Sequence, residues 1–312
     1  MGRKVLSLPE LSYAVLHKNS KSYFRIINSM VQYDHRNKVG NQGDLIKHFA
    51  LYSAASDMAN TMAFLGKRRK VFSYVETHTG RSHYQIDMSA PSSDWLTGAG
   101  YYLDNYQRFL EQIDPKDELL LDRLNGFGEL LESRQVGDEI KYLGSSALVS
   151  NQLTEAGIDY HADLFDVNQE VCQELECNSN QLTTVQCSSG YEGARNIKDI
   201  DLLFIDPPDL KPGIEGHFQR YKNLLFHCYR EHIPYVSWNP LYADQSLAGP
   251  SLECRIVNET ARIHGLGLIT VRWSDWSEKM CGCQMLFNVV GGSLYVEQCN
   301  KLALMMGWKI EA

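Results

Sequence analysis

The chain has 312 residues, of which 44% are hydrophobic and 22% charged. This composition is typical of a globular protein large enough to bury a full α/β core. The formal net charge of −8 argues against a long nucleic-acid interface, which usually has a basic excess. A local basic patch stays open, with residues 67–70 and the stretch between Arg3 and Arg25 as candidates, although such charge runs more often form solvated helix ends.

The sequence predicts neither a membrane span nor a metal site. No run of about 18 apolar residues predicts a membrane span, and no apolar segment near the N-terminus resembles a secretory signal. The eight cysteines contain no CxxC pair, and Cys281 and Cys283 are the closest two. Because a structural zinc site normally uses two such pairs, we expect a cytoplasmic protein with reduced, mostly buried thiols and no metal centre.

In chain order, the first chemical cluster lies at residues 33–48, and an apolar-periodic pattern after it predicts a helix to Ala63. Asp44 suits the N-cap or the first turn of that helix, where unpaired backbone N–H groups favour an acid. Lys47 and His48 could bind a carboxylate such as that of a methionyl group, and the alternative is a solvated first turn.

The next segments predict a division into subdomains. Residues 70–76 predict a short buried strand, and 77–84 the loop at its carboxyl end. Residues 87–139 have a polar helical pattern that is too long for a simple strand-to-helix connection. We therefore predict the following organisation: an N-terminal extension at 1–30, a Rossmann-like domain formed by 31–86 and 140–312, and an inserted helical subdomain at 87–139.

Strands and helices then alternate, with a helix opening at Gly144. Strands are expected at 158–162, 181–187, 201–205, 235–238 and 266–272, and at 285–290 as an antiparallel edge. The alternation predicts an α/β fold with a doubly wound, Rossmann-like sheet that binds its ligands at the carboxyl ends of the strands.

Asp206-Pro207-Pro208, directly after the apolar run 201–205, is the most specific motif. Two prolines cannot continue a strand ladder or freely start a helix, so they predict a stiff turn at the sheet edge. The Asp206 carboxylate and the Pro207 carbonyl can then accept both N–H groups of one amine and direct its lone pair at an electrophilic methyl group. The alternative is a plain strand-ending turn.

Two weaker motifs lie at other strand ends. The loop Glu76–Gly80 has one glycine, Gly80, that lets a cofactor approach the backbone. Asp163 follows the expected strand 158–162, where an acid can accept hydrogen bonds from ribose hydroxyls. The alternative for such an acid is a helix cap.

Together and in this order, these motifs resemble the bacterial large-subunit ribosomal RNA adenine-N6 methyltransferases that carry an inserted helical subdomain. The resemblance covers roughly residues 31–290. The matching residues are Tyr33-Asp34-His35, Gly40-Asn41, Asp44-Leu45-Ile46-Lys47-His48, Glu76-Thr77-His78-Thr79-Gly80, Gly144-Ser145, Asp163, Ser189-Gly190-Tyr191 and Asp206-Pro207-Pro208.

The resemblance implies the following roles. S-adenosylmethionine would be bound by residues distributed along the chain: Lys47 at its methionyl end, with His48, His78, Gly80, Ser145, Asp163, Ser189 and Gly190 around it. Asp206, with Pro207, would hold the target amine, and Tyr33 would lie near the target. The resemblance also implies RNA binding and a part in ribosomal RNA processing.

The chain departs from the family at three positions. Ser82 replaces a glycine of the cofactor loop, Ser189 replaces an acid, and Asp209 replaces the aromatic residue that follows the two prolines. That aromatic stacks on the target base in the family, and base stacking is worth about 1–3 kcal/mol. A carboxylate at 209 instead favours a cationic or amine-bearing substrate.

Three functions therefore stay open. The first is an adenine-N6 methyltransferase that acts on RNA or DNA. The second is an S-adenosylmethionine-dependent transferase that acts on a small amine-bearing molecule or a peptide. The third is a non-catalytic cofactor-binding protein within an RNA or protein complex.

Overall fold

The computed structural model describes most of the chain after its first 34 residues. The described residues are 35, 38–66, 71–178, 182–208, 210, 216–244, 249–274 and 280–311. The predicted extension 1–30, both candidate basic segments, Tyr33 and Asp209 lie outside them. No helix in the described ranges is long and apolar enough to cross a membrane.

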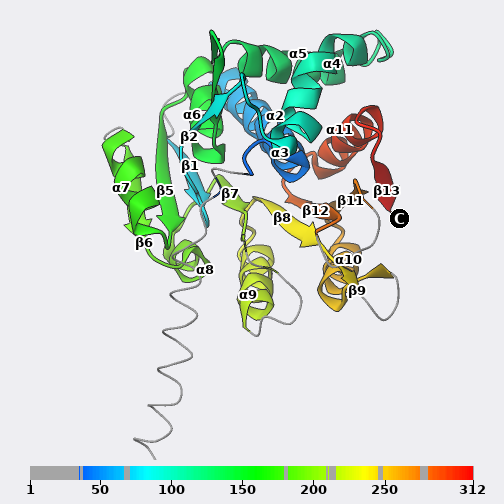
Figure 1. The fold of residues 1–312 in the computed structure, drawn as a ribbon. Coiled ribbons are helices and arrows are strands. Elements are labelled where there is room, and N and C mark those ends of the chain that lie inside the picture. The colour runs from blue at the N-terminus through cyan, green and yellow to red at the C-terminus, as the bar shows by residue number, and fades with distance from the viewer. Residues whose placement is uncertain are drawn as a thin grey trace, which may run out of the picture.

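A mixed sheet of eight strands forms the centre of the molecule, with helices on both faces (Figure 1). In spatial order its strands are β6 (Thr183–Cys187), β5 (Tyr160–Asp166), β1 (Phe72–Glu76), β7 (Leu202–Ile205), β8 (Tyr235–Leu241), β12 (Gly282–Asn288), β11 (Gly267–Arg272) and β13 (Lys309–Glu311). The first five are parallel, whereas β12 is antiparallel to both of its neighbours. This is the Rossmann-like α/β sheet that the alternation of elements predicts.

Two hydrophobic clusters hold the helices to the sheet. One face is covered by α2 (Gln42–Phe64), α6 (Ser145–Glu155) and α11 (Gly292–Met305), and the other by α8 (Gly190–Gly193), the 3-10 turn η2 (Ala194–Asn196), α9 (His217–Arg230) and α10 (Leu252–His264). Helix α7 (Gln169–Asn178) lies by β5 and β6. Because β7 is buried along its whole length and helices pack on both of its faces, it needs a continuous apolar sequence, which Leu202–Ile205 supplies.

The segment between β1 and α6 forms a separate layer on α2. It contains β2 (His83–Asp87), α3 (Ser93–Thr97), α4 (Ala99–Leu110), α5 (Glu118–Glu132), β3 (Gln135–Val136) and β4 (Glu139–Leu143). The amide of Ala99 donates to the Gly40 carbonyl at 2.7 Å, and a Cβ on Gly98 would lie only 2.1 Å from that oxygen. The subdomain boundaries remain a prediction, but this contact ties its first helices to the start of α2.

Three local predictions need correction. The strand at 282–288 is antiparallel as expected, but it lies between β8 and β11 rather than at the edge, because it pairs with both. His83 and Tyr84, expected in a loop, begin β2 because they pair with β4. Strand β5 continues to Asp166, since its last residues still pair with β6, so Asp163 lies inside the strand and not at its end.

Two further expectations are confirmed. Asp44 is in the first turn of α2, and Asn41 takes the N-cap position by accepting the Asp44 amide at 2.9 Å. All eight cysteines are free, six of them buried.

Two strands with no part in the site, β9 (Ala243–Asp244) and β10 (Gly249–Pro250), pair as a short ribbon.

Candidate active site

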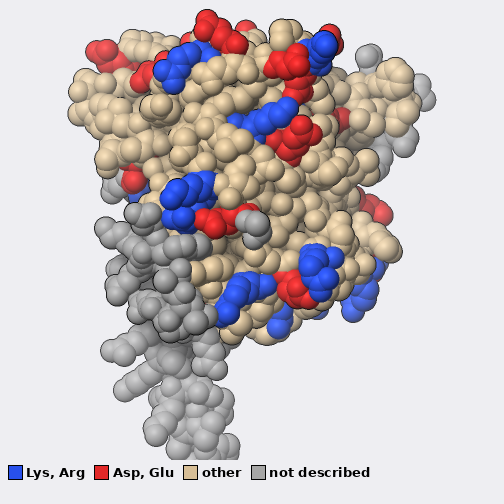
Figure 2. Space-filling model, turned by 90° about the vertical axis from the view of Figure 1, so that its right-hand side faces the viewer, with Lys and Arg blue, Asp and Glu red and all other residues tan. Residues whose placement is uncertain are grey.

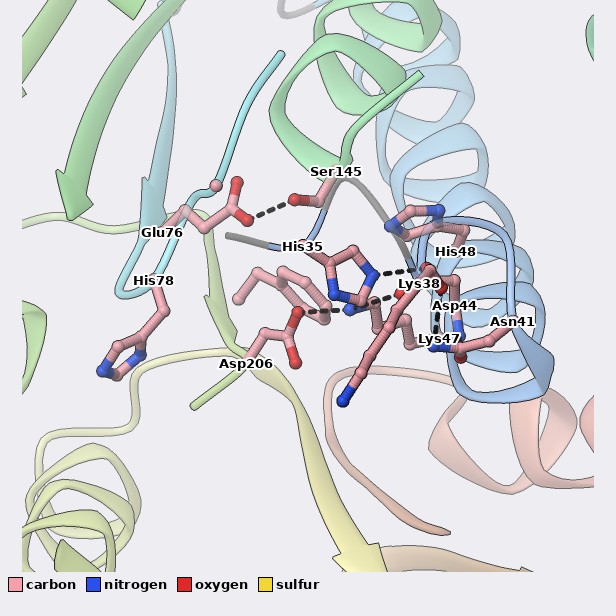
Figure 3. Close-up of polar contacts among 12 residues, drawn as sticks. His35, Lys38, Asn41, Asp44, Lys47, His48, Glu76, His78, Ser145 and Asp206 are labelled. Carbon is pink, nitrogen blue, oxygen red and sulfur yellow. Dashed lines mark hydrogen bonds and ion pairs between the residues drawn. The ribbon is translucent and has the colours of Figure 1, made fainter. Parts of the chain in front are cut away.

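The order of strands along the chain reverses between β1 and β7. Strands β1, β5 and β6 proceed in one direction across the sheet, and β7 and β8 are added on the other side of β1. In such sheets ligands bind at the carboxyl ends of the strands where the order reverses. Glu76 ends β1 and Asp206 follows β7, so the two carboxyl groups mark this point (Figure 3).

On the β7 side, an ion cluster joins the start of α2 to the Asp-Pro-Pro turn. The Lys47 ammonium lies 2.7 Å from an Asp206 carboxylate oxygen and 2.9 Å from Asp44. Asp44 in turn contacts His35 Nε2 at 2.6 Å and accepts the Gly40 amide at 2.8 Å. The GN…DLIKH motif and the Asp-Pro-Pro motif, 159 residues apart between Lys47 and Asp206, therefore form one structure.

The charges of this cluster stabilise one another. Burial acts to lower the pKa of Lys47, but Asp206 and Asp44 outweigh it and raise the pKa well above its usual value. Burial acts to raise the pKa of Asp44, but His35 and Lys47 outweigh it and hold the pKa well below its usual value. The ammonium of Lys47 and the carboxylate of Asp44 thus stay ionised, although only 12% and 2% of the side chains are exposed.

An aromatic ring completes the β7 side. The strand register places Ile205 opposite Ser237, so Trp238 comes level with Asp206 on the neighbouring strand. The Lys47 ammonium lies 5.6 Å from the centre of the Trp238 ring, within the range of a cation–π interaction. Asp206, Lys47 and Trp238 therefore surround one point with a carboxylate, an ammonium group and an indole.

On the β1 side, the site is uncharged. The hydroxyl of Ser145 donates to one Glu76 carboxyl oxygen, and that of Tyr74 donates to the other at 2.8 Å. Burial raises the pKa of Glu76 to about 8, with Asp206 adding to the rise and the two hydroxyl groups opposing it. Near pH 7, Glu76 is therefore mostly a neutral carboxylic acid.

The loop after β1 is held by β5. Gly80 has a φ of +63°, which favours glycine, and its amide donates to the Asp166 carboxylate at 2.9 Å. The Thr79 amide donates to the Phe165 carbonyl at 3.0 Å. Asp166, not Asp163, is thus the acid at the end of β5 beside this loop, whereas Asp163 lies 3.2 Å from His161.

Two glycines let neighbouring backbones meet at this loop. A Cβ on Gly190 would lie 2.0 Å from the Thr77 carbonyl oxygen, and one on Gly144 would lie 2.1 Å from that of Arg81. The GS turn and the start of α8 therefore pack directly against both ends of the loop. The Ser189 hydroxyl is used locally, because it donates to Glu192.

Both candidate histidines are neutral. Burial and then the charge of Lys47 lower the pKa of His48 to about 3, and its Nδ1 lies 2.8 Å from the Tyr142 hydroxyl. Burial and then His217 lower the pKa of His78 to about 3. His78 Nδ1 lies 2.8 Å from the Thr77 hydroxyl oxygen, and its ring packs edge-on against Tyr191.

Most of the sequence-predicted residues therefore gather at one sheet edge, while Tyr33 and Asp209 lie outside the described residues. Sequence reasoning assigned no role to Asp166 and matched Glu76 to a motif without a role of its own. Asp166 could have been found by extending the strand pattern four residues. Nothing in the local sequence indicated the contact between Lys47 and Asp206.

The cofactor side fits S-adenosylmethionine. Asp166 offers a carboxylate at the strand end where ribose hydroxyls are usually bound, and Gly80 exposes backbone without a side chain. In the first turn of α6, the buried Ser146 hydroxyl has no hydrogen-bond partner among the described residues. These groups would hold the nucleoside, with His78 and Tyr191 adjacent to it.

The chain is similar in sequence to two ribosomal RNA methyltransferases. No protein-family model matches the chain. Over 190 residues it is 24% identical to ribosomal RNA large subunit methyltransferase J of Haemophilus influenzae, an alignment that covers 57% of this chain and 59% of that protein. It is 21% identical over 216 residues to the Escherichia coli protein of the same name, covering 66% of this chain and 71% of that protein. The chain thus spans less than two thirds of the Haemophilus relative.

Among solved structures, protein LPL1258 of Legionella pneumophila has a TM-score of 0.60 and 17% identity, covering 88% of this chain and 98% of that one. This structural similarity shows that the two proteins share a fold. The chain is therefore a distant homologue, over most of its length, of the ribosomal RNA large subunit methyltransferase J proteins, and it shares its α/β fold with LPL1258.

Proposed function

We propose that this protein is an S-adenosylmethionine-dependent N-methyltransferase whose acceptor is the N6 amine of an adenine in large-subunit ribosomal RNA. The observation that carries the proposal is the position of Asp206. Its carboxylate follows β7 where the strand order reverses, beside the loop that suits the cofactor. The homologues named above methylate ribosomal RNA, and this agrees with the proposal.

The proposed mechanism is positioning of the acceptor nitrogen. S-adenosylmethionine, when bound, supplies an electrophilic methyl group. The Asp206 carboxylate accepts one N–H of the acceptor amine and the Pro207 carbonyl accepts the other, which directs the nitrogen lone pair toward the cofactor side. Such an in-line displacement depends chiefly on orientation.

Lys47 and Trp238 have supporting roles in this proposal. Lys47 pairs with Asp206 before the acceptor binds. When the acceptor amine displaces Lys47 from Asp206, the Lys47 ammonium stays paired with Asp44. Trp238, only 8% exposed, places an indole against Lys47 next to Asp206.

The test is mass spectrometry of nucleosides after incubation of the protein with S-adenosylmethionine and unmodified ribosomal RNA. We expect N6-methyladenosine at a single position. Asp206→Ala should lower kcat by at least about 100-fold, the usual scale for losing one transition-state contact, while the cofactor Kd changes less than about threefold. Asp138→Ala, which removes an exposed carboxylate in the β3–β4 turn, is the control.

Asp209 supports a second class of methyl acceptor. An additional carboxylate beside the Asp-Pro-Pro turn favours a small cationic amine. The same assay therefore includes an arm with a metabolite extract in place of RNA. Methyl transfer in that arm alone would replace the adenine proposal with the small-amine one, and transfer in neither arm would refute both.

A further inference from the structure

Helix α9 has an unusual composition for this acidic protein. From His217 to Arg230 it contains no acidic residue, while it carries Arg220, Lys222, Arg230 and two histidines. Its apolar side packs on the sheet through Tyr221, Leu224, Leu225 and Cys228. The outer side is therefore basic in a chain whose net charge is −8.

A shallow groove lies where the last turns of α9 meet η2. It is lined by Arg195, Asn223, Phe226, His227, Tyr229 and Arg230. His227 Nδ1 in this groove is buried and has no hydrogen-bond partner among the described residues. Burial, then Arg195, and to a smaller degree Arg230 lower the pKa of His227, as expected when both guanidinium groups lie near its ring.

Aromatic rings are exposed beside these cations. Phe226 is 45% exposed and Tyr229 is 41% exposed. His264 at the end of α10 packs against Tyr229 at a tilt of 41° with ring centres 4.0 Å apart, and it meets Phe226 edge-on at 6.1 Å. The rings are thus supported from one side and open on the other, as in a platform for planar ligands.

Another face of the molecule has a mixed charge. On the side of α11 and β13, Lys and Arg side chains alternate with Asp and Glu, and no continuous basic surface forms (Figure 2). At the α9 groove, Arg230 pairs with Glu231 at 2.8 Å on a highly exposed surface. Such an exposed pair is worth little, and a phosphate can compete for it.

We propose that the outer face of α9 is a binding track for single-stranded RNA, with a phosphate held by Arg195 and Arg230 and bases stacked on Phe226 and Tyr229. A basic groove with aromatic platforms is the usual chemistry of single-strand recognition. The proposal rests on the proposed function to the extent that the acceptor is RNA, and it adds a second contact outside the catalytic site.

The geometry of α9 links this track to the active site. Its first residue, His217, lies close enough to His78 to contribute to lowering that pKa. The helix then runs about 20 Å, at 1.5 Å per residue, to the groove at its far end. RNA that flanks a target nucleotide at Asp206 can therefore follow α9 and reach the groove.

The test measures fluorescence anisotropy of a labelled 12-nucleotide adenine-containing RNA against the full chain at several salt concentrations. Arg195→Gln with Arg230→Gln should weaken binding and reduce the slope of log K against log[salt] by about 0.7, the value for one phosphate contact. Phe226→Ala with Tyr229→Ala should weaken binding at least about tenfold without changing that slope. Arg108→Gln with Lys116→Gln, which removes two exposed cations near α4, is the matched control.

Methylation of an adenosine trinucleotide, too short to reach the groove, separates this inference from the proposed function. We expect the groove variants to keep that activity and to lose activity only on the long RNA. Wild-type affinity and salt slope in both groove variants would overturn the track, even if the enzyme methylates RNA. Equal losses in the Arg108 and Lys116 control would also overturn it, since binding would then be non-specific attraction to charge. A shift from dimer to monomer in the groove variants, with RNA binding unchanged, would identify a second copy of the chain as the occupant.

Discussion

Two carboxyl groups at the same sheet edge have different kinds of partner. Asp206 at the end of β7 contacts an ammonium group, whereas Glu76 at the end of β1 contacts two hydroxyl groups. In the proposed function, the β7 side binds the acceptor amine through its N–H groups. The β1 side lies against the loop after β1, where a neutral acid can donate as well as accept a hydrogen bond. Burial is the largest cause of the raised pKa of Glu76, whereas Asp206 keeps 12% of its side chain exposed and pairs with Lys47.

Lys47→Met should produce the largest change in stability. It removes the shared partner of two carboxylates, and breaking a buried ion pair from one side costs about 3–5 kcal/mol. Urea unfolding at pH 7 would measure this cost. Lys38→Met, an exposed lysine in the same motif, should change the free energy of unfolding by less than about 0.5 kcal/mol. Equal stability of the two variants would mean that the ionised β7 side needs no ammonium group.

Glu76→Gln should remove a pH dependence that only the β1 side has. The pKa of Glu76 is about 8 in the folded protein and near 4.3 in an unfolded chain, so between these values the folded state holds a proton that the unfolded state lacks. Its contribution to stability is full below about pH 4 and is lost as the pH rises to about 8, by at most about 1.4 kcal/mol per pH unit. The glutamine variant should lack this slope.

Unfolding curves from pH 5 to 9 for the wild type, Glu76→Gln and the exposed control Glu129→Gln would measure the difference. Parallel curves for the wild type and Glu76→Gln would show that Glu76 is ionised in the folded protein, and the contrast between the two sides would disappear. A slope lost in Glu129→Gln as well would assign it to the surface charge of the protein.

The sequence predicts local elements better than the contacts between them. The apolar run 201–205 with two prolines after it predicts a buried strand that ends in a turn, and this is confirmed. The contact of Lys47 with Asp206 joins segments 159 residues apart, and no local pattern encodes it. The place of β12 inside the sheet was missed for the same reason, because pairing order depends on contacts far apart in the sequence.

Asp163 illustrates a different failure. An acid inside an apolar segment was interpreted as the end of the strand, but the pairing of β5 with β6 extends to Asp166 and Cys187. A strand buried on both faces has no alternation to mark its end. The strand boundary was therefore wrong by four residues, and Asp166 rather than Asp163 lies at the end of β5.

The smallest effect concerns these two acids, and it sharpens the β1 side of the comparison. Successive side chains of a strand point to opposite faces, so Asp163 shares a face with Phe165, and Asp166 shares one with Leu164; these two apolar residues belong to different clusters. Asp166 also accepts the Gly80 amide of the cofactor loop.

We therefore expect Asp166→Asn to weaken S-adenosylhomocysteine binding about tenfold, the loss of one hydrogen bond to a charged group. Asp163→Asn should change that Kd less than about twofold. Isothermal titration calorimetry on both variants would show which of the two acids contributes to cofactor binding. Thermal unfolding would check that each variant is folded. The reverse order of effects would return the ribose contact to Asp163 and would mean that the loop at Gly80 is not where the cofactor binds.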